Sequence, residues 1–503
     1  MNNLIEYLEN IVHRFPDKPA YVDEQKSITF GQLLLQGKNI ATQILICVKE
    51  KINQPIAILM DKSADMIQAY LSVTYSANFY TPLDTTSPVS RLKKIVDVLN
   101  PTAILVSDKY VKKAQDIGFS SEKILIYEKV ILEAYDELMI KHALDRKLDT
   151  DPIYTLFTSG STGTPKGVTI CHRSVIDYIE WVCETFSISE NDVFGNQAPL
   201  YFDNSILDIY STLKTGATMC LIPEKLFMFP IKLIEYLNQK RINTIFWVPS
   251  ALIYVANSGV FNKMKPEHLK KVLFCGEVMP NKQLNIWRKA LPEALYANLY
   301  GPTEITDACT FFIVDRPMED NEPLPIGIPC RNTDILVLND KNELVIGEEK
   351  GELCVRGSSL ALGYYNNPEK TASSFVQNPL NSHYPELIYR TGDIVKYNEN
   401  RELIYLCRKD FQIKHMGHRI EIGEIETAVL SLPDVQNGCI IYDDAEDKIV
   451  LFYQAIQNID RDILTALRRL LPKYMLPNRL VQKEKLPMNR NGKIDRVLLK
   501  GML

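Results

Sequence analysis

The chain has 503 residues, of which 46% are apolar and 24% are charged, and its formal net charge is −5. At about 100–200 residues per domain, this length predicts more than one folded unit. Like charges form no long block that would indicate a nucleic-acid partner or an anionic membrane surface. The N-terminus is acidic, no apolar run reaches the ~18 residues that span a bilayer, and the ten cysteines include no C-x-x-C pair. We therefore expect a cytoplasmic protein without a structural zinc site or a disulfide frame.

Strand and helix patterns alternate through the first part of the chain. Ile56–Met60 and Ala103–Val106 are typical of buried strands, and Ala64–Ala77 between them has helical spacing. Strand, helix and strand at this interval predict right-handed βαβ units and a mainly parallel sheet. The pattern returns further along, with strands expected at Ala217–Ile222, Thr244–Val248 and Lys271–Phe274 and helices at Pro230–Gln239 and Asn281–Ala290.

Short, closely spaced strands follow residue 325 and predict a smaller β subdomain. They are expected at Thr333–Leu338, Gly351–Arg356, Ile394–Tyr397 and Leu403–Leu406. The remaining residues are typical of a separate α+β lobe, with helices at Ile420–Leu432 and Asp460–Leu471 and strands at Cys439–Tyr442 and Ile449–Tyr453. The expected fold class is α/β. A large N-terminal domain (1–407) of mainly parallel sheets flanked by helices carries the β subdomain, and a small C-terminal domain (408–503) follows.

One loop is rich in glycine and hydroxyl residues and ends in a lysine. It runs from Thr158 to Lys166, directly after the apolar strand pattern Ile153–Phe157. Glycines let backbone N–H groups converge on an anion, and the hydroxyls and the lysine add donors and charge. The order of residues is not that of a Walker A loop. The loop is interpreted as a phosphate cradle; the alternative is a flexible linker.

Four further motifs are weak signals when each is taken alone. Tyr300–Glu304 offers a ring for a purine, a hydroxyl for a phosphate and a carboxylate for Mg²⁺, or it is an ordinary Gly-Pro turn. Tyr389–Asp393 ends in a carboxylate that suits ribose hydroxyls, or it is a common Thr-Gly-Asp turn. Arg408–Glu421 is typical of a hinge or of a solvated linker. Pro487–Arg496 presents Lys493 at an Asn-Gly turn; the alternative is that this lysine near the C-terminus is an ordinary exposed surface residue.

In this order and at these intervals, the motifs resemble the adenylate-forming superfamily of acyl- and aminoacyl-adenylating enzymes. The resemblance extends from Ile28 to Asp495 and includes Gly351–Leu353, Gly363–Tyr365 and Arg419–Glu426. It implies that the protein joins a carboxylate to AMP, with ATP and Mg²⁺ as cofactors, and then passes the acyl group to a thiol. Because that attack brings two anions together, positive charge and oriented donors must offset their repulsion.

The resemblance also implies a role for each matching residue. Thr303 would contact the α-phosphate, Glu304 would hold Mg²⁺, and Lys493 would bridge the substrate carboxylate and the α-phosphate as the catalytic lysine. Asp410 would be the hinge about which a mobile C-terminal lid turns after adenylation. The implied nucleotide-binding residues are Thr158, Ser159, Gly160, Ser161, Thr162, Gly163, Lys166, Gly276, Glu277, Asn298, Leu299, Tyr300, Gly301, Pro302, Thr303, Asp393, Tyr405, Arg408 and Lys493.

The segment Ala198–Asp203 resembles the branch of the superfamily that activates amino acids. In that branch an aspartate at the position of Asp203 pairs with the substrate α-ammonium. Asp203 is also suited to cap a helix over Asn204–Leu213, and one side chain can do both. The same alignment implies substrate contacts from Phe202, Asp203, Trp247, Cys275, Asp307 and Lys493, with Leu207, Leu273, Leu299 and Ala308 as further wall positions.

Phe274–Glu277 has the form seen in D-alanine–carrier-protein ligases, a stand-alone group of similar length. Three residues depart from that group's pattern: Asp307 replaces a small apolar residue, Trp247 is bulkier than expected, and Cys407 replaces a glycine before the hinge. A second carboxylate in the pocket suggests serine or a basic amino acid as substrate. Since a buried unpaired carboxylate is costly, Asp307 either has a partner or the alignment is shifted there.

The expected function is therefore ATP-dependent adenylation of an amino acid, D-alanine or another small or polar one, and transfer to the phosphopantetheine thiol of a carrier protein. Two enzymatic alternatives are an acyl-CoA synthetase and a nonribosomal-peptide-type adenylation enzyme for a different amino acid. A third alternative is a catalytically silent ATP-binding scaffold, against which the presence of Lys493, Glu304 and Asp393 argues. The resemblance also implies a monomer.

Overall fold

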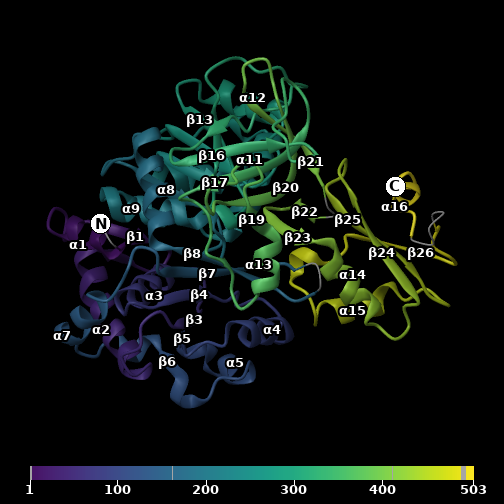
Figure 1. Cartoon of the computed structure of the whole chain (residues 1–503). Helices are drawn as coiled ribbons and strands as arrows, with labels where there is room; N and C mark the ends of the chain where they lie inside the picture. Colours follow the sequence, from purple (N-terminus) through teal and green to yellow (C-terminus); the bar gives the residue numbers. More distant parts are fainter. Residues whose placement is uncertain (1–2, 161–162, 410–411, 489–493) are drawn as a thin grey trace.

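The computed structural model describes residues 3–160, 163–409, 412–488 and 494–503. Two large sheets form the main body, with the C-terminal lobe set to one side of it (Figure 1). The first sheet has seven strands in the order β18-β8-β7-β4-β3-β5-β6, and strands β3 to β7 run parallel. Its strands are β3 (Pro55–Leu59), β4 (Phe79–Pro82), β5 (Ala103–Val106), β6 (Ile124–Ile126), β7 (Pro152–Thr158), β8 (Lys166–Cys171) and β18 (Gly363–Tyr364).

The second sheet has nine strands in the order β15-β14-β13-β12-β11-β9-β10-β1-β2. It is parallel from β13 to β1 and antiparallel at both ends. Its strands are β1 (Pro19–Val22), β2 (Ser27–Thr29), β9 (Val193–Asn196), β10 (Thr218–Leu221), β11 (Thr244–Trp247), β12 (Lys271–Cys275), β13 (Leu295–Tyr300), β14 (Thr310–Ile313) and β15 (Ile328–Pro329).

Helices cover the sheets on both faces, and two of them are buried almost all round. Helices α3 and α9 lie within the core that joins the two sheets, where Tyr80 on β4 and Tyr210 on α9 share a hydrogen bond of 3.0 Å. A helix without a polar face belongs in such an interior. The helices of the main body are α1 (Ile5–Val12), α2 (Phe30–Cys47), α3 (Ala64–Tyr75), α4 (Val89–Leu99), α5 (Val111–Asp116), α6 (Tyr127–Val130), α7 (Glu137–Leu144), α8 (His172–Thr185), α9 (Asn204–Thr215), α10 (Pro230–Gln239), α11 (Pro249–Asn257), α12 (Asn281–Ala290) and α13 (Pro368–Ser374).

The predicted β subdomain is an antiparallel sheet in the order β16-β17-β20-β19, with β21 paired to β20. Between the paired strands β17 and β20 the chain leaves this sheet to add β18 to the seven-stranded sheet, and it returns through α13 and β19. Its strands are β16 (Thr333–Leu338), β17 (Gly351–Gly357), β19 (Phe375–Gln377), β20 (Leu387–Tyr397) and β21 (Leu403–Arg408).

The C-terminal lobe has its own hydrophobic core. Helices α14 and α15 pack on one face of its three-stranded sheet, and Leu486 and Leu499 pack on the other. A two-stranded hairpin precedes α14 and extends toward the main body (Figure 1). The elements are β22 (Gln412–His415), β23 (His418–Glu421), α14 (Ile422–Leu430), β24 (Asn437–Asp443), β25 (Lys448–Gln454), α15 (Asp460–Leu467), β26 (Arg479–Lys483) and α16 (Arg496–Lys500).

The structure confirms the predicted fold class and most of the predicted elements. The helix expected from Ile420 begins at Ile422, because Ile420 and Glu421 complete β23, and the helix from Asp460 ends at Leu467 instead of Leu471. The domain boundary at residue 408 stays a prediction. Within the described ranges, every helix is too short or too polar to cross a bilayer.

Candidate active site

The glycine-rich loop is the tight connection between β7 and β8. A side chain at Gly160 would place its Cβ 1.9 Å from the Thr164 carbonyl oxygen, and Gly163 has a left-handed φ of 77°. The Gly163 N–H donates to the Gly160 carbonyl over 2.9 Å. Only glycine allows this curl without a clash. Two predicted members of the loop, Ser161 and Thr162, lie outside the described residues.

The C-terminal lobe covers this loop and supplies carboxylates to it. Gly160 N–H donates to Glu424 Oε2 over 3.2 Å, and Lys166 Nζ lies 3.1 Å from Glu421 Oε1. The Ser159 hydroxyl accepts from the Glu421 N–H at 2.9 Å and donates to the Arg419 carbonyl at 2.8 Å. Backbone N–H and lysine donors that suit an anion therefore hold protein carboxylates in this arrangement.

Glu304 is fully buried and is engaged at both oxygens. Tyr364 donates its hydroxyl to Oε1 over 2.7 Å, and Arg419 Nη1 donates to Oε2 over 2.5 Å. Burial raises the pKa of Glu304, but Arg419, Lys166 and the two hydrogen bonds outweigh it and hold that pKa at about 2. The carboxylate is therefore ionised at every physiological pH.

Asp203 caps α9 at the edge of the same site. Its Oδ1 accepts from the Asn204 N–H over 3.0 Å, so the predicted capping role is present. Burial raises the pKa of Asp203, while the neighbouring Thr303 hydroxyl lowers it. The structure thus places Asp203 beside the Tyr300–Glu304 motif. Phe202 points its ring at His418 of the hairpin, with 4.8 Å between ring centroids.

Tyr300, Asp393 and Arg408, which the resemblance assigns to the nucleotide, contact one another. The Tyr300 hydroxyl donates to Asp393 Oδ2, and Arg408 Nη1 lies 2.9 Å from Asp393 Oδ1. Lys414 of the hairpin lies 5.5 Å from the centroid of the Tyr300 ring. A ring, a carboxylate and a guanidinium in contact form a surface suited to a nucleoside.

The other predicted nucleotide residues surround this group. Asn298 Nδ2 donates to the Pro325 carbonyl over 2.8 Å, and a side chain at Gly301 would lie 2.5 Å from the Asp307 carbonyl. Leu299 and Pro302 are buried, and Tyr405 packs against the core from β21. Thr158 keeps a buried hydroxyl without a partner among the described residues.

Glu277 links the main body to the hairpin. The Gly417 N–H donates to Glu277 Oε1 over 2.6 Å, and the Ser250 N–H donates to Oε2 over 2.9 Å. Gly276 before it has a φ of 107°, a conformation that requires glycine. The sequence pointed to the Glu277 backbone, but it is the side chain that holds the hairpin turn.

The predicted substrate wall divides between the two faces of the nine-stranded sheet. Leu273, Cys275 and Leu299 pack in the core that also contains α9, together with Leu207 and Ala308. Trp247 faces the opposite side, where its indole N–H donates to the Gly195 carbonyl over 2.8 Å and its ring packs on Trp287. Successive residues of a strand alternate between faces, so the structure does not bring Trp247 together with the other predicted wall residues.

Asp307 lies in the same interior, with an exposed fraction of 1%. The Tyr178 hydroxyl of α8 donates to Asp307 Oδ2 over 2.7 Å, so the predicted need for a partner is met at one oxygen. Its Oδ1 is buried without a partner among the described residues. Burial raises the pKa of Asp307 well above its usual range, and the charge of Asp203 raises it further.

Two predicted residues, Lys493 and Asp410, lie outside the described residues. The neighbours of Lys493 can be placed: Met488 and Ile494 form an antiparallel bridge, and Ile494 packs near Leu486. That side of the small sheet is opposite to the side that carries α14 and α15. Residues next to Lys493 therefore lie on the face of the lobe away from the glycine-rich loop.

Several contacts in the site were not assigned from the sequence. Tyr364 and Arg419 were noted only as parts of motifs, and Tyr178 was not noted at all. Arg91 on α4 pairs with Glu424 in a contact that is almost fully buried on both sides. Long-range pairing of this kind leaves no periodic signal in the sequence. The position of Arg91 on the apolar face of α4 does indicate that it needs a buried partner, because arginine is seldom buried unpaired.

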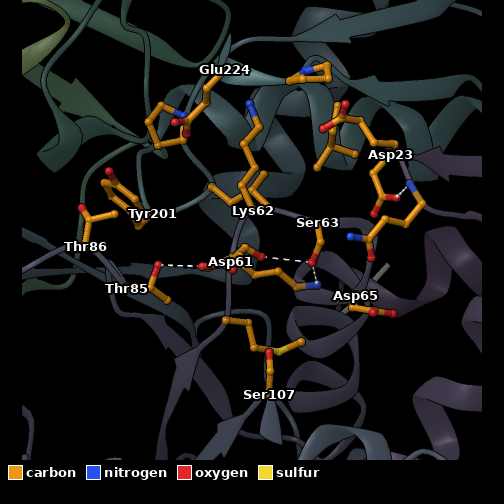
Figure 2. A pocket seen from close by; sticks show the side chains of 18 of the residues that line it. Asp23, Asp61, Lys62, Ser63, Asp65, Thr85, Thr86, Ser107, Tyr201 and Glu224 are labelled. Carbon is orange, nitrogen blue, oxygen red and sulfur yellow. Dashed lines mark hydrogen bonds between the residues drawn. The ribbon is translucent and has the colours of Figure 1, made fainter. Parts of the chain in front are cut away.

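A cavity separate from the predicted site residues is lined in part by the Pro199–Tyr201 segment. This cavity of ≈ 810 Å³ opens at the carboxyl ends of β3, β5 and β10, and acidic side chains outnumber lysines in its lining. Figure 2 shows Lys62 rising from its wall toward Glu224, and Thr85 donating to Asp61 over 2.8 Å. None of the predicted site residues lines it, although Tyr201, the neighbour of Phe202, does.

Comparison with known proteins places the chain in a family. Residues 8–365 match the AMP-binding enzyme family, and residues 424–493 match the AMP-binding enzyme C-terminal domain. The chain belongs to the AMP-binding enzyme family.

Two full-length relatives and one solved structure are similar to it. L-proline–[L-prolyl-carrier protein] ligase of Pseudomonas fluorescens is 31% identical, and D-alanine–D-alanyl carrier protein ligase of Bacillus licheniformis is 30% identical, each over 99% of both chains. The crystal structure of the Vibrio cholerae adenylation domain AlmE in complex with glycyl-adenosine-5′-phosphate has a TM-score of 0.84 at 22% identity, covering 100% of this chain and 98% of that one. At that identity the structural likeness concerns the fold.

Proposed function

We propose that the protein is an ATP-dependent ligase that adenylates an amino acid and transfers it to the phosphopantetheine thiol of a carrier protein. The observation that carries this proposal is Asp203, a half-buried carboxylate that lies beside Thr303 and Glu304. A carboxylic acid without an amino group would leave that charge uncompensated. The two carrier-protein ligases that match the chain end to end support the same activity.

In the first step, a carboxylate oxygen of the amino acid attacks the α-phosphorus of ATP, and the bond to pyrophosphate breaks. In the second step, the carrier thiolate attacks the acyl carbon and AMP leaves. A carboxylate is already a nucleophile at pH 7, so the chain needs no general base for the first step. Positioning and positive charge supply most of the rate.

The described residues divide between nucleotide and amino acid. We assign the adenosine to Tyr300, Asp393 and Arg408, which already contact one another. The phosphates are assigned to the loop donors Gly160 N–H and Lys166, and the α-phosphate to Thr303. We assign Lys493 to the reacting carboxylate and Asp410 to the hinge. The boundary between the N-terminal domain and the C-terminal lobe is proposed at residue 408. D-alanine remains the first candidate substrate, and another small or polar amino acid the second.

Glu304 is suited to Mg²⁺ only after the C-terminal lobe has moved. Mg²⁺ is commonly held by one or two carboxylates plus substrate phosphates, and Glu304 Oε2 is occupied by Arg419 in this arrangement. Once Arg419 withdraws, one oxygen of an ionised carboxylate is free beside the phosphate loop. The ion would offset phosphate charge there. We further propose a cytoplasmic, monomeric enzyme.

The test is ATP–pyrophosphate exchange with a panel of D- and L-amino acids, aryl acids and fatty acids. We expect exchange with at least one amino acid and none with the unaminated acids. Loading of radiolabelled amino acid onto phosphopantetheinylated D-alanyl carrier protein then tests the second step. Exchange that depends only on an aryl or fatty acid, with coenzyme A as acceptor, would support an acyl-CoA synthetase instead.

A further inference from the structure

The interior beneath the candidate active site holds two acidic side chains that act on each other. Asp203 begins α9, and Asp307 follows the short turn Thr303–Ile305. Helix α9 packs against α8, which carries the Tyr178 partner of Asp307. Asp307 is buried and Asp203 is half-buried, and the charge of Asp203 raises the pKa of Asp307.

No cation among the described residues compensates Asp307. The groups that act on it are Asp203 and Asp208 of α9, Tyr178 of α8, Tyr154 of β7, and the thiols of Cys275 and Cys330. All of them are acids or neutral donors. Tyr178 satisfies Oδ2, while Oδ1 is buried without a partner among the described residues.

The backbone that delivers Asp307 is itself unusual. Thr306 has a φ of 60° and Asp307 a φ of 73°, so two consecutive non-glycine residues adopt the left-handed conformation. Such residues cluster at functional sites, because the surrounding structure must hold them against their preference. Here the conformation turns a carboxylate inward, where it meets Tyr178, instead of into solvent.

We propose, resting on the amino-acid ligase function above, that the preferred substrate is an amino acid whose side chain carries a second ammonium group. The α-ammonium pairs with Asp203, and the side-chain ammonium pairs with Asp307 Oδ1, with Tyr178 positioning that carboxylate. A hydroxyl side chain gives Oδ1 a hydrogen bond but no charge. An alkyl side chain gives it neither, so it leaves a buried polar atom unsatisfied.

ATP–pyrophosphate exchange with matched pairs of amino acids tests this proposal. The pairs are 2,4-diaminobutyrate against 2-aminobutyrate, ornithine against norvaline, and lysine against norleucine, with serine, proline and D-alanine added. We expect kcat/KM for the best diamino acid to exceed that of its neutral partner about 100-fold or more, since a site built for a polar group rejects analogues that lack it. Preference for serine, proline, alanine or a neutral partner would overturn the proposal while leaving the ligase function intact.

The variant Asp307→Asn examines the residue itself. It should remove most of the preference for the diamino acid, and exchange with the neutral partner should persist or rise. Tyr178→Phe removes the hydrogen bond that positions Asp307, so it should raise KM for the diamino acid, but by less than Asp307→Asn does. ATP binding and the melting temperature report folding. If the wild type catalyses exchange with an aryl or fatty acid but with no amino acid, the amino-acid ligase function is wrong as well. That outcome differs from a preference for a neutral amino acid, which would overturn only the diamino-acid proposal.

Discussion

Arg419 donates from Nη1 to Glu304 Oε2 over 2.5 Å, so a cation of the C-terminal lobe holds the carboxylate that we assign to Mg²⁺. Glu421 and Glu424 hold Lys166 and the Gly160 N–H at the same time. The guanidinium of Arg419 therefore occupies the carboxylate that would bind the metal. The carboxylates of Glu421 and Glu424 occupy the donors that would bind the phosphates. If MgATP binds where we propose, it competes with the docked lobe for the same partners, and we assign this arrangement to the step after pyrophosphate has left.

The first prediction concerns Arg419→Ala. We expect transfer of the aminoacyl group to pantetheine to fall about 10–100-fold, because a charge-assisted hydrogen bond to a buried carboxylate is lost. Exchange should fall little, since Glu304 becomes free for the metal. Single-turnover assays of each step make the measurement. Arg468→Ala, an exposed arginine of the same lobe, is the control and should change neither step.

Glu421→Gln should shift the same competition toward ATP. The substitution removes the charge that Lys166 Nζ meets at 3.1 Å while keeping the shape of the side chain. We expect the KM for ATP to fall about two- to tenfold, as one moderately buried ion pair is weakened. An unchanged or higher KM for ATP would show that Glu421 does not compete with the phosphates.

Lys493→Ala should separate the two half-reactions. If this lysine joins the substrate carboxylate and the α-phosphate, exchange should fall about 100-fold or more, as expected for the loss of a group that stabilises transition-state charge. Transfer from a preformed aminoacyl adenylate should stay close to normal. Lys500→Ala, which removes an exposed lysine paired with Asp444, serves as the matched control. Exchange that survives in the Lys493 variant contradicts the assigned role.

Asp203→Asn should distinguish substrate binding from helix capping. Asparagine caps helices about as well as aspartate, whereas an alanine cap costs about 0.5–2 kcal/mol. We expect the Asn variant to keep its melting temperature but to raise KM for the amino acid at least about tenfold, with little change for ATP, because the counter-charge of the α-ammonium is lost. Wild-type kinetics in the Asn variant would mean that Asp203 acts only as a cap.

Asp208 predicts a pH dependence of stability. Burial raises its pKa to about 7 from 3.8, although Asn196 and Lys62 oppose the shift. Between these two pKa values, the folded protein keeps a proton on Asp208 that the unfolded chain releases. The contribution of Asp208 to the free energy of unfolding is therefore fully present below about pH 4 and is lost as the pH rises to about 7. Asp208→Asn, always neutral, should be more stable than the wild type at pH 8 by about 2–4 kcal/mol.

Urea unfolding at pH 5 and pH 8 measures this difference. The advantage of the Asn variant should shrink at pH 5, where Asp208 is protonated in the folded protein. Asp116→Asn, at an exposed position on α5, should show no comparable change with pH. Equal stability of the Asp208 variant and the wild type at pH 8 would contradict the raised pKa.

Local patterns predicted most of the elements. α10, α12, β5 and β16 have the expected bounds, because helix periodicity, apolar runs and flanking turn residues act over short stretches of chain. Motifs rather than periodicity assigned Tyr300, Asp393 and Arg408 to one ligand, and the three residues contact one another. Trp247 was assigned to the substrate wall, but strand alternation turns it to the other face of its sheet.

Residue types and their spacing along the chain were enough to predict the class of fold and the glycine-rich loop. Three pairings became known from the folded chain alone: Tyr178 with Asp307, Arg419 with Glu304, and Arg91 with Glu424. These partners are 129, 115 and 333 residues apart. Desolvation makes such charges depend on their neighbours in space, and those neighbours exist only once the two sheets, the helices between them and the C-terminal lobe have come together.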